Sequence, residues 1–410
     1  AYFAEVPVQA SIPSSVHSTE TGDAPPPVQP TLPPVSIEMT LPHGPSLLPH
    51  AEKFTREHVT GAYLGNHPEM TERQTARLVN ILHQHKSTFA HDIRSMPGYH
   101  GAAGPFTIPL THNNSIISKK RPKSPQDAAI INEKCTAMEE AGIIHPAPPF
   151  TQYASDVTLP AKKDSAGNAV DKRFCVDYRP LNAASLPDHY GMHSPDDLFR
   201  RIAGARFFSK MDMKAGYHQI PVHPQDVQKT SFWWLNRLYS YHRMPFGAKN
   251  ASAHFQRAMD TEILQHGLAH CCQSFVDDML VFSNTAEEHV QHVEQALRMI
   301  HDCGLRAHPD KSYFASDSIE FLGHLVSPYG LSPEHAKVAT IKNLPHPQNL
   351  QDQQAKMGQL GYYRRFVPGF SAIAYPINKL TAKGVTWHWG EEQAAAFEEL
   401  KAAITKPGLV

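Results

Sequence analysis

The sequence predicts an α+β fold, because it contains both strand-like apolar runs and capped helical patterns. Residues 271–283 have the pattern of a tight β-hairpin, with apolar, β-favouring residues on both sides of two adjacent aspartates. Residues 207–220 begin with a second strand-like run. Helical patterns begin at the capping residues Ser124 and Thr285. The hydrophobic fraction of 41% is adequate for a packed core.

Two adjacent carboxylates, Asp277 and Asp278, occupy the turn of the expected hairpin. Neighbouring carboxylates in a turn repel each other, and a bound cation relieves this repulsion. Most Asp-Asp pairs are solvated turns, so the pair alone leaves both interpretations open. Asp212 interrupts the apolar run of 207–220, where it either caps the following segment or is a third carboxylate of one site. The three side chains form the oxygen-rich set that two Mg²⁺ ions need when they lie about 3.5–4 Å apart.

Four helices are expected, at residues 71–90, 124–142, 285–304 and 391–404. The second begins at a serine followed by proline, the third begins with a capping box, and a glycine ends both. Four apolar residues on one face of the third helix are expected in the core: Val290, Val293, Leu297 and Ile300. Strands are expected at 172–178 and 321–326.

Composition excludes little about binding partners. A net charge of −1 does not indicate any particular kind of partner, and a total near zero can hide a local basic channel. The five cysteines show neither metal-type spacing nor a disulfide framework, which indicates a reducing compartment. His289 and His292 fall in a helical pattern and are expected on the surface rather than as ligands. No apolar run approaches the roughly 20 residues of a membrane span, and no signal peptide is evident.

The first 50 residues are rich in proline, which favours extended, solvated backbone over a core. We expect a disordered linker that extends to about residue 70, and a polyproline docking site is the alternative. The chain begins with Ala1, which suggests a segment of a longer polyprotein or an incomplete reading frame.

Several ordered motifs together resemble the reverse transcriptase of gypsy-type (Metaviridae) LTR retrotransposons. They lie at residues 174–182, around Asp212, at 244–257, at 276–278 and at 321–324. The resemblance runs from about Ser87 to the C-terminus. It implies a right-hand polymerase with fingers, palm and thumb, in which the palm is an antiparallel sheet packed on helices.

The resemblance also implies a division of the chain into five parts. These are a Pro-rich linker at 1–70, an N-terminal helical extension at 71–115, fingers and palm at 116–330, a thumb at 331–382, and the truncated start of a connection or RNase H-like segment at 383–410. Because the sequence stops before the carboxylates of an RNase H domain, we expect no RNA cleavage by this segment.

Site residues follow from the same resemblance. Asp212, Asp277 and Asp278 are implied as catalytic residues and metal ligands. Lys162 and Arg173 are implied to clamp the triphosphate of a dNTP, and Lys163 can replace Lys162 if the register differs by one.

Tyr217 is implied to exclude a 2′-hydroxyl from the site, or is an ordinary core tyrosine. Phe246 is implied to lie against the nascent base pair, and Gln256 resembles a structural position.

Three groups of residues are implied to contact nucleic acid, and solvated surface charge is the alternative for the basic ones. They are Lys119, Lys120 and Arg121 of the fingers, Gly323 and His324 of the primer grip, and Arg364 and Arg365 of a thumb helix at 359–366.

The implied function is RNA-directed DNA polymerase, which transfers a nucleotide from a dNTP to a primer 3′-hydroxyl on an RNA or DNA template. Mg²⁺ is the implied cofactor, with Mn²⁺ as a substitute. Expected partners are template RNA, primer and duplex DNA, dNTPs, and protease, RNase H and integrase domains outside this chain, with no membrane.

The expected location is a virus-like particle in the cytoplasm, or the nucleus. The alternative function is a catalytically inactive, retroelement-derived nucleic-acid-binding or scaffold protein. Departures from the family pattern keep this alternative open, such as Ser252 where proline is common.

Overall fold

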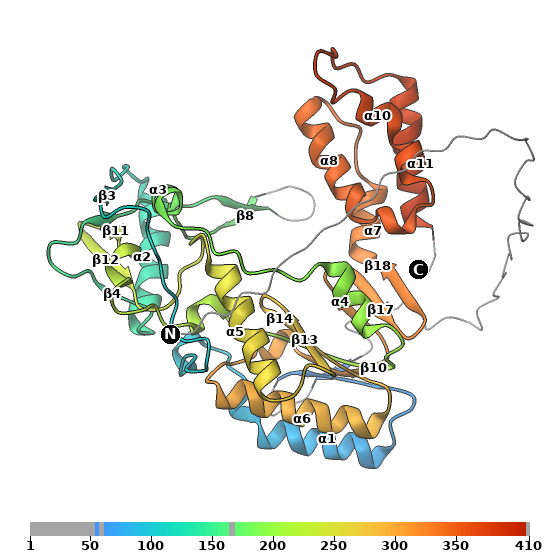
Figure 1. Ribbon diagram of the computed structural model, residues 1–410, viewed down its shortest axis with the longest axis horizontal. Helices are drawn as coiled ribbons and strands as arrows, with labels where there is room; N and C mark the ends of the chain where they lie inside the picture. Colours follow the sequence, from blue (N-terminus) through green and yellow to red (C-terminus); the bar gives the residue numbers. More distant parts are fainter. Residues whose placement is uncertain (1–53, 57–60, 164–168, 407–410) are drawn as a thin grey trace, which may run out of the picture. The chain divides into compact units, whose positions relative to one another are not determined.

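The computed structural model describes residues 54–56, 61–163 and 169–406, so most of the expected linker lies outside the described residues. Its largest sheet has six strands in the order β1-β2-β15-β10-β14-β13. Three of them, β10, β14 and β13, are labelled in Figure 1. The strands are β1 (Phe54–Arg56), β2 (Tyr63–Gly65), β10 (Phe207–Asp212), β13 (Cys272–Phe275), β14 (Asp278–Ser283) and β15 (Tyr313–Ser316). Neighbours pair antiparallel except β2 and β15, which are parallel. The expected antiparallel sheet is confirmed, with one parallel pair added.

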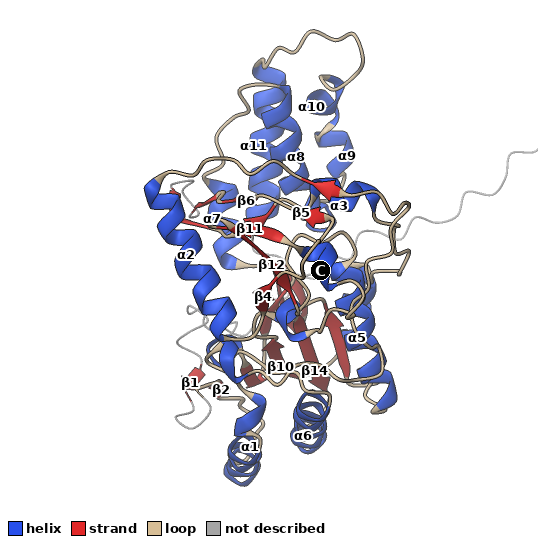
Figure 2. Cartoon of the chain, turned by 90° about the vertical axis from the view of Figure 1, so that its left-hand side faces the viewer, coloured by secondary structure: helices blue, strands red, loops and turns tan. Residues whose placement is uncertain are grey.

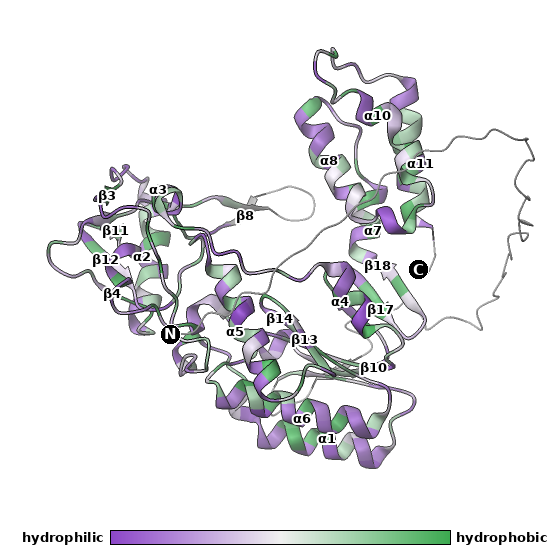
Figure 3. Ribbon diagram, viewed as in Figure 1, coloured by the Kyte–Doolittle hydropathy of each residue, from purple (hydrophilic) through white to green (hydrophobic). Residues whose placement is uncertain are grey.

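Helices cover one face of this sheet. The helices on this face are α1 (Glu72–Gln84), α5 (Ala251–Gln265) and α6 (Ala286–Asp302), whereas α4 (Pro195–Ile202) lies on the opposite face. α6 packs on β10 and β14, and α1 lies beside α6 (Figure 2). Met211, Met279 and Val281 point to this side, because they share one core with Val290 and Leu297 of α6. Figure 3 shows that hydrophobic and hydrophilic residues both occur along α1 and α6, as expected of helices with one buried face.

The opposite face has its own core, because side chains alternate along each strand. Phe208, Leu280 and Phe282 lie there with Phe199 of α4 and Phe321. A three-stranded sheet contributes to this core and consists of β16 (Ile319–Phe321), β17 (His324–Ser327) and β18 (Gly330–Pro333). Asp212 and Asp278 alternate in phase with Phe208 and Leu280, so they lie on this face.

Smaller sheets form much of the segment between residues 116 and 241. A three-stranded sheet has the order β11-β12-β4, and three strand pairs are β3/β5, β6/β9 and β7/β8. Their bounds are β3 (Ile116–Ile117), β4 (Ile144–Pro146), β5 (Tyr153–Ala154), β6 (Val157–Thr158), β7 (Ala161–Lys163), β8 (Ala169–Lys172), β9 (Cys175–Val176), β11 (Phe232–Trp234) and β12 (Arg237–Tyr241). The helices here are α2 (Pro125–Glu140) and α3 (Arg179–Ala184).

The C-terminal helices share a third hydrophobic core. They are α7 (His335–Lys342), α8 (Leu350–Tyr362), α9 (Phe370–Ile373), α10 (Tyr375–Lys379) and α11 (Glu391–Thr405). Leu360, Ile377, Phe397 and Leu400 are buried in this core. It therefore includes residues on both sides of the expected thumb boundary at 382, and that boundary stays a prediction.

Most expected helices are confirmed. α2 begins after a Ser124 cap, α6 begins with the Thr285 capping box, and α11 lies where a helix was expected. The helix expected at 71–90 is shorter in the structure. α1 ends at Gln84, and a 3₁₀ turn follows at Lys86–Thr88.

Two expected strands and one expected helix are shorter than predicted, because each is interrupted within its range. The strand expected at 172–178 is interrupted at Arg173, between β8 and β9. The strand expected at 321–326 is divided by a turn between β16 and β17. The helix expected at 359–366 ends with α8 at Tyr362, and a 3₁₀ turn follows at Arg364–Phe366.

One burial prediction was wrong. His289, expected on the surface, is fully buried, while His292 is half-buried. In the described residues we find no helix with the length and apolar character needed to cross a bilayer.

Leu297 tests the packing of α6 against the sheet. Its side chain is fully buried, so Leu297→Ala should lower the free energy of unfolding by about 2–5 kcal/mol. The exposed neighbour Gln295 provides the control, because Gln295→Ala should change stability by less than about 0.5 kcal/mol. Urea unfolding followed by circular dichroism measures both. Equal stability of the two variants would contradict this packing.

Candidate active site

Three carboxylates that are far apart in the sequence meet at one end of β10 and β14. The antiparallel register places Asp212 directly opposite Asp278. The backbone N–H of Met213 donates to the carbonyl of Asp277 at 2.8 Å, which brings the hairpin turn beside the end of β10. The predicted convergence of Asp212, Asp277 and Asp278 is therefore present.

The turn that carries Asp277 is strained and held from one side. Val276 has φ 51°, a left-handed conformation that β-branched residues rarely adopt. Gln256 of α5 is fully buried, and its Oε1 accepts the Val276 N–H at 2.7 Å. The amide nitrogen of Gln256 donates to Ser274 and Asp260. The structural role expected of Gln256 is therefore specific, because it fixes the hairpin that presents the carboxylates.

Burial and mutual repulsion both disfavour ionisation of the cluster. Burial, followed by the charges of Asp212 and Asp278, raises the pKa of Asp277 to about 7. Burial also raises the pKa of Asp212, and the ammonium group of Lys311 opposes that rise. The protein therefore holds negative charge here at a free-energy cost that a cation would offset.

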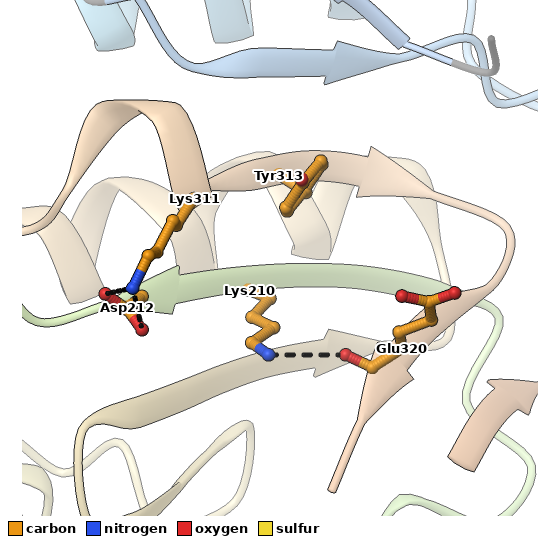
Figure 4. Close-up of a pocket in the computed structure, with 5 residues that line it drawn as sticks. All are labelled: Lys210, Asp212, Lys311, Tyr313 and Glu320. Carbon is orange, nitrogen blue, oxygen red and sulfur yellow. Dashed lines mark hydrogen bonds and ion pairs between the residues drawn. The ribbon is translucent and has the colours of Figure 1, made fainter. Parts of the chain in front are cut away.

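Two lysines that sequence reasoning missed lie against the carboxylates. Lys311 Nζ lies 3.3 Å from Asp212 Oδ1, and Lys210 Nζ lies 3.0 Å from Asp278 Oδ1. Lys210, Asp212 and Lys311 line an open pocket of about 210 Å³, together with Tyr313 and Glu320 (Figure 4). The one local signal in the sequence was Lys210, two residues before Asp212 and so on the same face of the strand.

The residues present fit a divalent cation bound to oxygen ligands. Asp277 Oδ1 is buried and has no hydrogen-bond partner in the described part of the chain. Gly216 leaves the space beside it, because a Cβ at this position would lie 2.5 Å from Asp277 Oδ1. A buried carboxylate oxygen without a partner is costly, and a hard cation is the ligand that such an oxygen suits.

Aromatic residues flank the cluster. The ring of Tyr217 stacks on Phe246 with centroids 4.9 Å apart, and its hydroxyl lies 2.6 Å from Ser252 Oγ. Burial raises the pKa of the Tyr217 phenol, the hydrogen bond with Ser252 opposes this, and the charge of Asp277 adds to it. Tyr217 is half-buried and packs against the main core, and its role at the sugar stays a prediction. Ser252, at the position where proline is common in the family pattern, is the hydrogen-bond partner of the Tyr217 hydroxyl.

Sequence comparison identifies the kind of domain that carries this site. Residues 161–326 match the reverse transcriptase (RNA-dependent DNA polymerase) family. The chain contains a reverse transcriptase domain. All three carboxylates, Tyr217 and Phe246 lie within the matched residues.

The resemblance to gypsy-type retrotransposon polyproteins is confirmed. The chain is 32% identical over 317 residues to the retrovirus-related Pol polyprotein from transposon gypsy of Drosophila melanogaster, covering 74% of this chain and 30% of that protein. It is 33% identical over 297 residues to the Pol polyprotein from transposon 297 of the same organism, covering 72% and 28%. The chain thus spans less than a third of the length of these relatives.

Solved structures confirm the right-hand polymerase fold. The foamy viral protease-reverse transcriptase in complex with RNA/DNA hybrid has a TM-score of 0.73 and 19% identity, covering 83% of this chain and 45% of that one. A second structure of that protein, in complex with double-stranded DNA, has a TM-score of 0.71 and 19% identity, covering 82% and 58%. At these identities the likeness shows the fold alone.

The expected triphosphate ligands lie on the β7–β8 hairpin of the reverse transcriptase domain. Lys162 and Lys163 belong to β7, but their side chains lie outside the described residues. Arg173 follows β8, is exposed, and donates its backbone N–H to Pro160 at 2.9 Å. Their role as triphosphate ligands stays a prediction.

Two residues of the basic run before α2 lie close to acceptor groups of the protein. Lys120 donates to Asn236 Oδ1 at 3.0 Å and to the carbonyl of Leu235. Arg121 lies 4.0 Å from the buried Asp156. Lys119 is exposed. Lys120 and Arg121 are exposed as well, so contact of these three residues with nucleic acid stays a prediction.

The expected primer-grip hairpin requires a correction. Leu322 and Gly323 form a two-residue turn with φ 48° and 70°, so Gly323 fits a left-handed position. His324, expected to contact nucleic acid, is only 1% exposed, and its ring lies against Phe199 and Tyr363. This side chain supports the hairpin, because a ring enclosed by other rings cannot reach a ligand.

The paired arginines of the expected thumb helix differ from each other. Arg365 forms an ion pair with Asp196 of α4, and its guanidinium lies over the ring of Phe199 at 5.2 Å. Arg365 therefore connects the C-terminal helices to α4. Its guanidinium is already engaged within the protein, and its contact with a nucleic-acid phosphate stays a prediction. Arg364 is exposed and remains a candidate for a phosphate contact.

The raised pKa of Asp277 predicts that the metal-free protein loses stability as pH rises. The carboxyl titrates near pH 3.9 in an unfolded chain and near 7 in the folded protein. The folded state therefore binds this proton more tightly, so its stabilising effect is complete below about pH 4 and is lost as pH rises through about 7. Chemical unfolding in EDTA across this range should show the decline.

The matched variant is Asp277→Asn, which removes the titrating group but keeps the shape. Its free energy of unfolding should fall less between about pH 4 and pH 8 than that of the parent, and added Mg²⁺ should stabilise the parent more. Parallel pH profiles for the two proteins would show that Asp277 does not titrate in this range.

Proposed function

We propose that this chain is the RNA-directed DNA polymerase segment of an LTR retrotransposon polyprotein. The observation that carries the proposal is the meeting of Asp212, Asp277 and Asp278 at one strand end, with a buried carboxylate oxygen that lacks a partner. A solvated Asp-Asp turn would have exposed oxygens and would not need Gly216 beside it.

The three carboxylates would hold two Mg²⁺ ions, for which Mn²⁺ can substitute. When bound, such ions favour attack by the primer 3′-hydroxyl on the α-phosphate of a dNTP and stabilise the leaving pyrophosphate oxygen. Oxygen ligands alone suit Mg²⁺, which keeps water and substrate phosphates in its remaining positions.

The other side chains of the site bind and orient the substrate. The ammonium groups of Lys210 and Lys311 add positive charge beside the carboxylates and so favour phosphate oxygens nearby. The stacked rings of Tyr217 and Phe246 supply an apolar surface for the sugar and base, and Phe246 is 46% exposed. Lys162 and Arg173 would hold the terminal phosphates of the dNTP.

The proposed partners are a template strand paired with a primer, and dNTPs. The foamy viral enzyme has been solved with RNA/DNA hybrid and with double-stranded DNA, and we propose the same duplexes for this chain. Contacts to phosphates and 2′-hydroxyls would dominate, so binding should weaken with salt and show little sequence preference. Protease, RNase H and integrase domains would lie elsewhere in the polyprotein.

Primer extension on an RNA template tests the catalytic assignment. With Mg²⁺ and dNTPs the parent should extend a DNA primer, whereas Asp277→Asn should reduce the rate by at least about a hundredfold, because a metal ligand loses its charge. Asp302→Asn, on the exposed end of α6, is the matched control and should extend normally.

Duplex binding, measured by fluorescence anisotropy, separates the possible outcomes. Full extension by Asp277→Asn would remove Asp277 from the mechanism. Tight binding without extension by the parent would instead support a nucleic-acid-binding or scaffold role.

Tyr217 tests how the enzyme would distinguish sugars. Tyr217→Val removes the ring that would lie under the sugar, so the preference for dNTPs over rNTPs should fall by about tenfold to a hundredfold. Tyr217→Phe keeps the ring and loses the hydroxyl bond to Ser252, and it should retain most of the preference. Single-nucleotide incorporation with each substrate gives the ratio. An unchanged ratio in Tyr217→Val would refute the role.

A further inference from the structure

A second cluster of metal-binding residue types lies at the other end of the β13–β14 hairpin from the aspartates. His270, Cys271 and His292 each offer one ligand atom, and these atoms all lie within 4.8 Å of one another. Cys271 immediately precedes β13, and its carbonyl accepts the N–H of Phe282 at 2.9 Å. Four residue steps along β14, or about 14 Å, separate Phe282 from Asp278. The cluster is therefore distinct from the proposed catalytic site.

Both imidazole rings form a hydrogen bond through Nδ1, which leaves Nε2 for a metal ion. His270 Nδ1 lies 3.0 Å from the carbonyl of Gly267, which can only accept, so His270 donates there. His292 Nδ1 lies 2.8 Å from Ser283 Oγ. These contacts leave the Nε2 atoms for a ligand, and this outer hydrogen bonding is typical of metal-binding histidines.

A buried polar chain supports His292 from behind. Ser283 Oγ also lies 3.0 Å from Nδ1 of the buried His289, and His289 Nε2 lies 2.7 Å from Ser209 Oγ of β10. Ser209 Oγ accepts the backbone N–H of Ala315 at 3.0 Å. The chain thus links the His292 ring to three strands of the central sheet and fixes its position.

The sulfur of Cys271 is buried and lies beside a backbone carbonyl and a second sulfur atom. The Cys271 thiol donates to the Leu268 carbonyl at 3.6 Å, and the sulfur of Cys272 lies 3.9 Å away. All five cysteines are free thiols, so no disulfide competes for this sulfur in the structure.

We propose that His270, Cys271 and His292 bind a zinc ion, with water in the fourth position. One thiolate and two imidazoles suit a borderline-soft ion such as Zn²⁺, whereas Mg²⁺ requires oxygen ligands. His270 is exposed, so one side of the cluster is open to the solvent that would supply the water.

Binding requires a small closure and the release of one proton. Zn–S bonds of about 2.3 Å and Zn–N bonds of about 2.0–2.1 Å imply ligand atoms somewhat closer together than at present. The exposed His270 side chain can supply this movement. The Cys271 thiol loses its proton to solvent, and its hydrogen bond to Leu268 is replaced by the metal bond.

The bound ion would join the base of the hairpin to α6, because Cys271 precedes β13 and His292 belongs to α6. Its role would be structural, and it would not enter the nucleotidyl transfer proposed for the carboxylates. Zinc should therefore raise the melting temperature of the protein without being required for duplex binding.

Cobalt titration of the fully reduced chain tests the proposal. Excess Mg²⁺ is present to occupy the carboxylates, and the near-ultraviolet charge-transfer absorption of a cobalt–thiolate bond is the signal. The parent should bind one Co²⁺ with this absorption, and Zn²⁺ should displace it. His270→Asn and Cys271→Ser should each weaken Co²⁺ binding by at least about tenfold, and the serine variant should lose the absorption.

Two control variants keep the ligand set intact. His301→Asn changes an exposed histidine of the same helix, and Cys175→Ser changes a half-buried cysteine of β9. Both should bind as the parent does. Asp277→Asn should also retain the signal, so a failed polymerase assignment and a failed zinc site give different results.

The outcomes are decisive because His270 is exposed and its replacement should not disturb folding. Absence of the charge-transfer band in the parent, or an unchanged affinity in His270→Asn, would overturn the proposal. A rise in melting temperature with Zn²⁺ in the parent but not in His270→Asn would support it independently.

Discussion

Repulsion among three carboxylates is the constraint on which the rest of this structure depends. The paired register of β10 and β14 holds Asp212 opposite Asp278, and the hairpin turn adds Asp277. Burial of Asp277, followed by the charges of Asp212 and Asp278, makes this arrangement costly, as the raised pKa of Asp277 shows. Lys210 and Lys311 offset only part of it. The surrounding fold must therefore be rigid enough to keep like charges together.

That rigidity comes from burial on both faces of the sheet. Met211 and Val281 pack toward α6, while Phe208 and Leu280 pack toward α4. A register shift of one residue would exchange these faces, so that side chains packed in one core would have to fit into the other. The hydrophobic cores thus fix the pairing of β10 and β14, and the pairing fixes the carboxylates. Gln256 completes this support by satisfying the N–H of a strained Val276.

Sequence reasoning succeeded where the signal was local or carried by an ordered motif. The caps at Ser124 and Thr285 predicted helix starts, and the motif order predicted that Asp212 would meet the Asp277 turn. It failed where tertiary packing decides the outcome. His289 and His324 are buried among residues that are distant in the sequence. His289 lies four residues before Val293 on the apolar face of α6, so its spacing indicated burial, whereas its contact with Ser209 of β10 has no local signal.

Other features were missed because no simple spacing encodes them. Leu322 adopts a positive φ, which leucine rarely does, so an unbroken strand was the reasonable prediction. The ion pair between Lys311 and Asp212 joins residues 99 positions apart. The grouping of His270, Cys271 and His292 depends on α6 packing beside the hairpin. Such sites become visible only when the strands and helices are placed together.

The space beside Asp277 also bears on how decayed copies of such elements are recognised. A methyl group at position 216 would lie 2.5 Å from Asp277 Oδ1 and 3.1 Å from the ring of Phe255, so the carboxylate would have to move. A genomic copy with alanine at this position would keep all three acidic residues and still hold one of them out of place. The presence of all three aspartates in a copy therefore does not by itself show that they are correctly placed.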